Sequence, residues 1–123
     1  MPNTTTFSRG AVVLIPFPFS DQTSSKVRPA VVVNPQYPSE DLLVVGLTSV
    51  GGTLRPGEFA IEFWREAGLL HPSFAKRAVA SVESNLVRRQ LGSLRDTDLT
   101  KLNDAIRLWF GLVSELEANP PRP

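Results

Sequence analysis

The stretch RPAVVVNPQYPSEDLLVVGLTS, residues 28–49, decides the fold. Its two apolar runs, RPAVVVN at 28–34 and LLVVGLTS at 42–49, predict two strands, and Pro29 stands at a strand start where a missing N–H is tolerated. The residues between them, PQYPSED at 35–41, have the composition of a turn. The second run is apolar almost throughout, which indicates a central strand that is buried on both faces.

Four further short segments predict strands around this pair. The chain contains 11 prolines, most of them within the first 72 residues, and they favour short strands and turns over long helices. One segment alternates apolar and polar residues with the period of a half-buried strand. The predicted strands are AVVLI at 11–15, the alternating EFAIEFW at 58–64, FAKRAVASV at 74–82, and LVRRQL at 86–91, which Gly92 is expected to end.

The C-terminal part changes to a helical period. A single apolar stripe with spacings of three and four is formed by Leu99, Leu102, Ile106, Trp109, Val113 and Leu116. The stripe predicts an amphipathic helix over 96–117, with Asp96 or Thr97 capping its first turn. Its apolar face must be buried against the sheet or against a partner chain.

These elements predict a mainly β protein with a C-terminal α-helix, built as a small antiparallel barrel. The chain is 123 residues long, which fits one domain. The predicted layout is a single domain over 1–123, with the barrel at 8–95, the helix at 96–117, and loose tails at 1–7 and 118–123.

Composition excludes several kinds of chemistry. The chain has no cysteine, which excludes disulfides, thiolate zinc sites and a cysteine nucleophile. His71 is the only histidine, so one subunit cannot supply a multi-histidine metal site. The sequence also lacks the phosphate-binding motif GxxxxGK[ST] and the motifs GxGxxG, HExxH and GxSxG. We therefore expect no metal and no cofactor.

With neither an apolar run of transmembrane length nor a secretory signal visible, we expect a cytoplasmic protein.

Two polar residues stand at the ends of the apolar strands. Arg28 opens the VVV strand after a polar loop at 16–27, and Thr48, followed by Ser49, ends LLVVGL. The residues alone favour a solvated arginine and an ordinary strand end over a functional pair.

The chain resembles the PemK/MazF family of toxin endoribonucleases from bacterial toxin–antitoxin modules. The resemblance covers about residues 8–112. It is carried by RGAVVLIPFPFSD from Arg9, SSKVRPAVVV at 24–33 and DLLVVGLTS at 41–49, and more weakly by LLHPSFAKR, LVRRQLGSL and DLTKLNDAIRLWFGL.

The resemblance implies an SH3-like barrel that forms a homodimer. It implies metal-independent, sequence-specific cleavage of single-stranded mRNA, in which the ribose 2′-OH attacks phosphorus and leaves a 2′,3′-cyclic phosphate and a 5′-OH. The family's catalytic arginine falls on Arg28 and its catalytic threonine on Thr48. The implied partner is an antitoxin whose disordered tail lies across the RNA groove. The general base is left unassigned.

Several other residues are candidates for RNA contact. Phe17 and Phe19 either stack unpaired bases or cap the barrel core, and the side chains of the 16–27 loop either reach phosphates or are simply solvated. Residues 65–95 carry six basic and two acidic side chains, a cationic footprint. The full candidate set is Phe17, Phe19, Ser24, Lys26, Ser49, Ser73, Lys76 and Arg77. For His71 we expect a surface or turn role, and for Trp64 and Trp109 packing in the core or at a dimer interface.

Two alternatives stay open. The first is a non-catalytic toxin of the same fold that poisons DNA gyrase, with Trp109 on the C-terminal helix as its contact. The second is a degenerate relative that binds RNA or an antitoxin but cuts poorly. It is suggested by Ala11 and Val27, which stand where relatives carry an acidic residue and, in some cases, a histidine.

Overall fold

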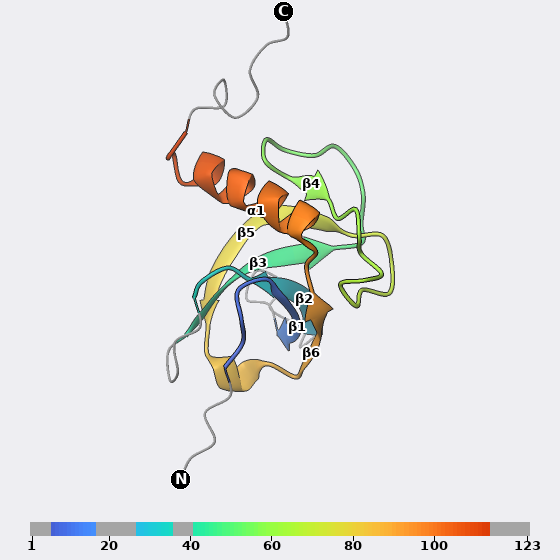
Figure 1. Cartoon of the computed structure of the whole chain (residues 1–123), viewed down its shortest axis with the longest axis vertical. Coiled ribbons are helices and arrows are strands. Elements are labelled where there is room, and N and C mark those ends of the chain that lie inside the picture. Colours follow the sequence, from blue (N-terminus) through green and yellow to red (C-terminus); the bar gives the residue numbers. More distant parts are fainter. Residues whose placement is uncertain (1–5, 17–26, 36–40, 114–123) are drawn as a thin grey trace, which may run out of the picture.

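The computed structural model describes residues 6–16, 27–35 and 41–113. One antiparallel six-stranded sheet, in the order β4-β5-β3-β2-β1-β6, curls around a core and is covered on one side by a single helix (Figure 1). This confirms the predicted fold class. The elements are β1 (Ala11–Pro16), β2 (Val27–Val32), β3 (Leu42–Thr48), β4 (Phe59–Ala60), β5 (Phe74–Val82), the 3-10 turn η1 (Ser84–Leu86), β6 (Arg89–Ser93) and α1 (Asp96–Trp109).

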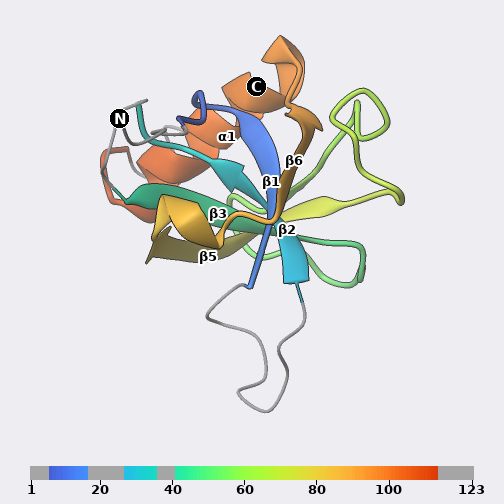
Figure 2. The same ribbon diagram turned by 90° about the horizontal axis from the view of Figure 1, so that it is seen from below.

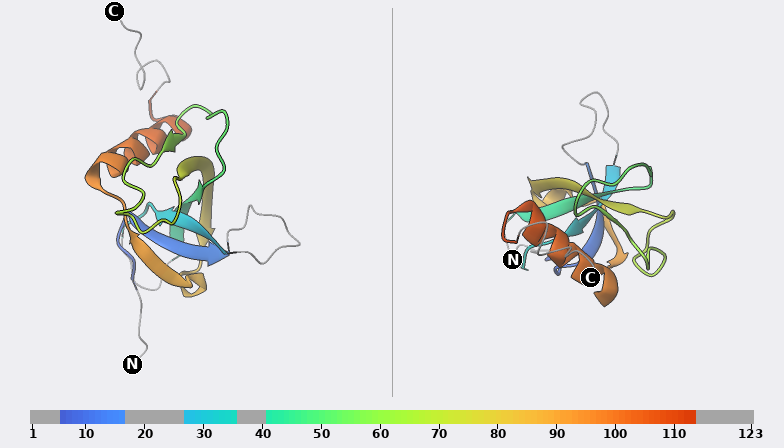
Figure 3. Two further views of the ribbon diagram at one scale, coloured as in Figure 1. Left: turned by 90° about the vertical axis from the view of Figure 1, so that its right-hand side faces the viewer. Right: turned by 90° about the horizontal axis from the view of Figure 1, so that it is seen from above.

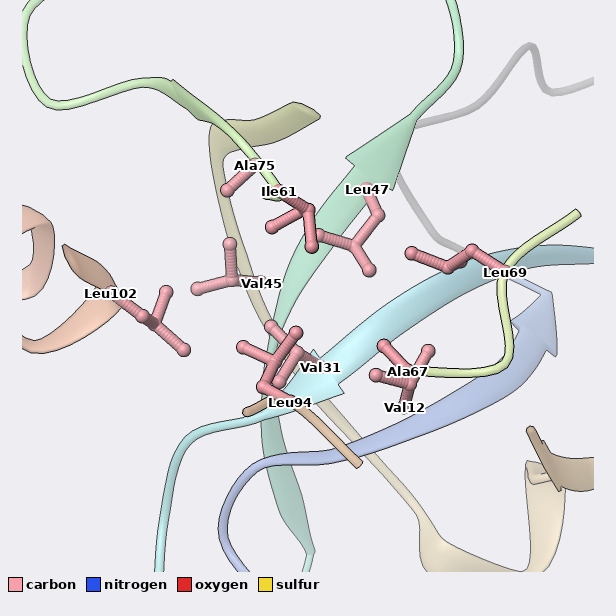
Figure 4. Close-up of a cluster of buried hydrophobic side chains, with 10 residues drawn as sticks. All are labelled: Val12, Val31, Val45, Leu47, Ile61, Ala67, Leu69, Ala75, Leu94 and Leu102. Carbon is pink, nitrogen blue, oxygen red and sulfur yellow. The ribbon is translucent and has the colours of Figure 1, made fainter. Parts of the chain in front are cut away.

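The apolar side chains form two clusters on opposite faces of the curled sheet. Because side chains alternate along a strand, Val12 belongs to one cluster while Val13 and Ile15 belong to the other. The cluster under the helix joins Leu102 of α1 to Val31 and to side chains from the segment after β4 (Figure 4). Both views of Figure 3 show α1 lying across one side of the curled sheet.

Strand β3 is central, as its apolar run predicts. It pairs with β2 on one side and β5 on the other. Five of its seven residues are buried, and the partly exposed Thr48 ends the strand. The exception to two-sided burial is Leu43, which is 44% exposed.

Strand β6 forms one edge of the sheet by pairing with β1 (Figure 2), and its bounds differ from the predicted 86–91. Ser84–Leu86 form a 3-10 turn, and the strand runs from Arg89 to Ser93. Gly92 therefore lies inside the strand rather than ending it. A Cβ at this position would lie 2.5 Å from the carbonyl oxygen of Ala67, so glycine allows the connector between β4 and β5, residues 61–73, to pack closely against β6.

The predicted strand over 58–64 is wrong beyond its first residues. Only Phe59–Ala60 pair with β5, and a turn follows. The physical reason is Asp98 of α1, whose two carboxylate oxygens accept hydrogen bonds from the backbone N–H groups of Glu62 (2.8 Å) and Phe63 (2.9 Å). A tertiary contact thus takes the donors that a sheet ladder would use.

Helix α1 is shorter than the predicted 96–117. Gly111 adopts a left-handed φ of 72°, while the N–H groups of Gly111 and Leu112 bond back to the carbonyls of Leu108 and Arg107. This pattern is a Schellman motif, and it ends the helix at Trp109. At the other end Arg95 is the N-cap without a side-chain bond, so the expected cap by Asp96 or Thr97 is wrong.

The N-terminal segment contributes to the core. Phe7 lies in the part expected to be a loose tail, yet it is only 9% exposed and packs with Val13 and Ile15. The other parts of the predicted tails, 1–5 and 118–123, lie outside the described residues. Within the described ranges no helix is long and apolar enough to cross a membrane.

Candidate nucleic-acid interface

A pocket of about 350 Å³ opens where β2 begins and β3 ends. Its walls come from four strands and from the connector between β4 and β5. The lining residues are Leu14, Val27, Arg28, Pro29, Leu47, Thr48, Ser49, Val50, Gly68, Leu69, Leu70, His71, Ser73, Arg89 and Leu91.

Strand register brings Arg28 and Thr48 to the same place. In the β2–β3 ladder Ala30 pairs with Gly46 and Val31 with Val45. The pairing ends at Ala30 and Gly46, and Arg28 and Thr48 each stand two residues beyond it on their own strand. Both residues line the pocket, although 20 positions separate them in the sequence.

The hydroxyl of Thr48 is oriented by the turn that follows it. Its Oγ1 accepts a hydrogen bond from the backbone N–H of Val50 at 3.1 Å. Because the oxygen is the acceptor in that bond, the hydroxyl can still donate its own proton to another group.

The pocket is cationic. Arg28 and Arg89 line it, and no carboxylate does so among the residues that the structure describes. Neither guanidinium forms an ion pair within the described ranges. Arg89 reaches this site because Leu14 of β1 pairs with Arg89 of β6 on one side and with Pro29 of β2 on the other. Two exposed guanidinium groups on one concave surface are suited to bind phosphate oxygens.

The connector after β4 forms the opposite wall. Gly68 has a φ of 86°, and a side chain there would run into the carbonyl oxygen of Leu91. The close approach holds the connector against β6 and brings His71 to the pocket. The chain then turns sharply, with the Ser73 hydroxyl donating a hydrogen bond to the His71 carbonyl at 2.8 Å.

The structure gathers only some of the residues predicted to contact RNA. Arg28, Thr48, Ser49 and Ser73 line the pocket, although the Ser73 hydroxyl is engaged and the residue is 4% exposed. Lys76 and Arg77 do not line it. The remaining candidates lie outside the described residues, namely Phe17, Phe19, Ser24 and Lys26.

The Lys76 side chain and the Arg77 backbone instead bind a buried carboxylate, that of Glu58. The Lys76 Nζ lies 3.6 Å from Oε2 of Glu58, which also accepts the Arg77 backbone N–H at 2.9 Å. Glu58 Oε1 accepts the Arg55 N–H at 2.8 Å. Burial raises the pKa of Glu58, but these backbone hydrogen bonds and the Lys76 charge outweigh it, so the pKa lies below its ordinary value.

Two polar residues of the pocket, Arg89 and His71, were not predicted as site residues. Arg89 was only one of the basic residues in 65–95, and His71 was expected in a surface or turn role. The local sequence around either residue gives no sign of the pocket, because the β1–β6 pairing and the packing of Gly68 against Leu91 bring them there.

A curled antiparallel sheet, one C-terminal helix and a cationic pocket at a strand end define a class of small barrel proteins equipped to hold an anionic ligand. Residues 8–110 match the family described as PemK-like, MazF-like toxin of type II toxin–antitoxin system. The chain belongs to this family, as its resemblance predicts.

Solved structures of similar fold include proteins from mycobacteria. An endoribonuclease in complex with its cognate antitoxin, from a mycobacterial species, superposes with a TM-score of 0.70 at 18% identity and covers 88% of this chain and 98% of its own. The Mycobacterium tuberculosis toxin MazF-mt6 gives a TM-score of 0.65 at 19% identity, covering 85% and 99% of the two chains. Likeness at this identity shows the fold. No curated protein sequence matches the chain.

Proposed function

We propose that the protein is the toxin of a toxin–antitoxin module and a metal-independent endoribonuclease that cuts single-stranded mRNA in the cytoplasm. The observation that carries the proposal is that Arg28 and Thr48 line one cationic pocket. Family membership and the endoribonucleases among the similar folds support it.

The chemistry follows from what the two side chains offer. Attack of the ribose 2′-oxygen on phosphorus gathers negative charge on the phosphorane oxygens, then expels the 5′-oxygen and leaves a 2′,3′-cyclic phosphate. The planar guanidinium of Arg28 presents paired donors that match two such oxygens. The Thr48 hydroxyl, oriented by the Val50 N–H, donates a further hydrogen bond. Preorganised donors of this kind typically contribute about 10²–10³-fold to rate each.

The rest of the pocket positions the strand. Arg89 neutralises a flanking phosphate, and Ser49 adds a polar contact at the rim. Lys76 and Arg77 are left out of this proposal because they do not line the pocket, and Lys76 is paired with Glu58. We further propose that the protein works as a homodimer, and that the cognate antitoxin inhibits it by laying an acidic tail across the same cationic surface.

The test is incubation of the purified protein with a long single-stranded RNA in EDTA, followed by analysis of the cut ends. We expect discrete cuts that leave 2′,3′-cyclic phosphate and 5′-OH ends. Intact RNA with folded, antitoxin-free protein would overturn the proposal. In that case inhibition of DNA gyrase supercoiling would favour the binding-toxin alternative.

A further inference from the structure

The reaction proposed for the pocket needs a group that removes the 2′-hydroxyl proton. The guanidinium groups of Arg28 and Arg89 stay protonated in proteins and cannot accept it. The hydroxyls that line the pocket are weak bases, and no carboxylate lines it within the described part of the chain. An imidazole is the remaining lining side chain that can accept a proton near neutral pH.

We infer that His71 is the general base of the nuclease, an assignment that rests on the function proposed above. It lines the same pocket as Arg28 and Thr48. The assignment comes from where the fold places this residue.

The backbone around His71 is well held, as a catalytic base requires. On its N-terminal side, Gly68 packs against Leu91. On its C-terminal side, the Ser73 hydroxyl donates to the His71 carbonyl, and the Ser73 carbonyl accepts the Ile61 N–H at 2.8 Å. The imidazole itself belongs to an exposed residue at the pocket rim, where it can meet a strand of RNA.

The charged side chains that share the pocket with His71, among the described residues, are two arginines. Arg28 of β2 and Arg89 of β6 face the same pocket, and the structure shows no carboxylate from 6–16, 27–35 or 41–113 lining it. Nor does the imidazole form an ion pair in those ranges.

The step balances as follows. A ring nitrogen of His71 takes the 2′-hydroxyl proton while the 2′-oxygen forms its bond to phosphorus. The bond from phosphorus to the 5′-oxygen breaks, and a water molecule protonates the leaving 5′-oxygen. The imidazolium then returns its proton to the hydroxide that the water has become, so the enzyme is unchanged.

The experiment measures kcat and KM for cleavage of an RNA oligonucleotide in EDTA, across pH, for the wild type, His71→Gln and Glu66→Gln. Glu66 is exposed in the same connector and lies outside the pocket, so its variant is the matched control. For His71→Gln we expect kcat to fall about 10²-fold with KM little changed, and the fall of kcat/KM on the acid side of the wild-type profile to disappear. Added imidazole should restore activity to His71→Ala, while Glu66→Gln should behave as the wild type.

The outcomes separate this assignment from the proposed function. A wild type that leaves the RNA intact overturns both. A wild type that cuts beside an equally fast His71→Gln overturns the assignment of His71 alone, as does a loss confined to KM. Denaturant unfolding of each variant checks that any loss of kcat occurs in folded protein.

Discussion

The fold treats its two buried carboxylates, Glu58 and Asp98, and the two arginines of the pocket in opposite ways. Asp98 and Glu58 are buried, and each accepts two backbone N–H groups. Arg28 and Arg89 are exposed and without ion pairs among the described residues. Within those residues no buried side-chain nitrogen or oxygen lacks a partner. The comparison teaches that polar groups used for structure are satisfied internally, whereas those left open are the ones available to a ligand.

The largest effect on stability is expected from Asp98→Ala. The change leaves the N–H groups of Glu62 and Phe63 without their acceptor, and we expect the free energy of unfolding to fall by about 3 kcal/mol. Denaturant unfolding measures it, with Asp104→Ala on the exposed face of α1 as the control. RNA cleavage per folded molecule should stay at the wild-type level. An unchanged unfolding free energy would show that the bonds of Asp98 are not structural.

Thr48→Val should act on rate and spare stability. It removes the hydroxyl but keeps the shape, so we expect kcat to fall about 10²-fold, or about 2.7 kcal/mol in activation free energy. Thr48→Ser keeps the hydroxyl and should retain most of the activity. Single-turnover cleavage makes the comparison. Equal rates for the valine variant and the wild type would remove Thr48 from the mechanism.

Glu58→Gln should lower the unfolding free energy by about 2 kcal/mol at neutral pH, because a hydrogen-bonded charge is lost. The folded state lowers the pKa of Glu58, so its stabilising effect is complete above the ordinary glutamate pKa and is lost as pH falls through the folded value. The difference between wild type and variant should therefore shrink on acidification below about pH 4.5. Unfolding measured across pH tests this, and a difference that grows in acid would contradict it.

Arg89→Ala should have the smallest effect. Loss of one phosphate contact should raise KM about 10-fold, about 1.4 kcal/mol of binding, and make KM less dependent on salt. Arg107→Ala, an exposed arginine of α1 outside the pocket, is the matched control. Equal KM values for the two variants would remove Arg89 from the binding surface.

Elements whose sequence signal lies within a single segment were predicted well. The apolar runs at 11–15, 42–49 and 74–82 correspond to β1, β3 and β5, and the stripe through Leu102 faces the core. The end of the helix could also have been predicted, because the expected helix contains Gly111 and a Schellman motif favours glycine at its left-handed position.

The features that were wrongly predicted or missed depend on contacts between segments distant in the sequence. The alternation over 58–64 is a strand signal, but Asp98 withdraws the backbone donors of Glu62 and Phe63. Likewise the pocket joins Arg28 and Thr48, indicated by family resemblance, to His71 and Arg89, which are brought there by the pairing of the first and last strands and by the packing of the connector. Local periodicity carries no information about such pairings.

The most direct test of the central claim is single-turnover cleavage of a single-stranded RNA in EDTA by the wild type and Arg28→Ala, with the unfolding free energy of both measured in parallel. Because Arg28 is exposed and has no ion pair among the described residues, we expect equal stability and a rate lower by about 10³-fold. Cleavage by Arg28→Ala at the wild-type rate would contradict the account, because the open guanidinium would then have no part in the chemistry.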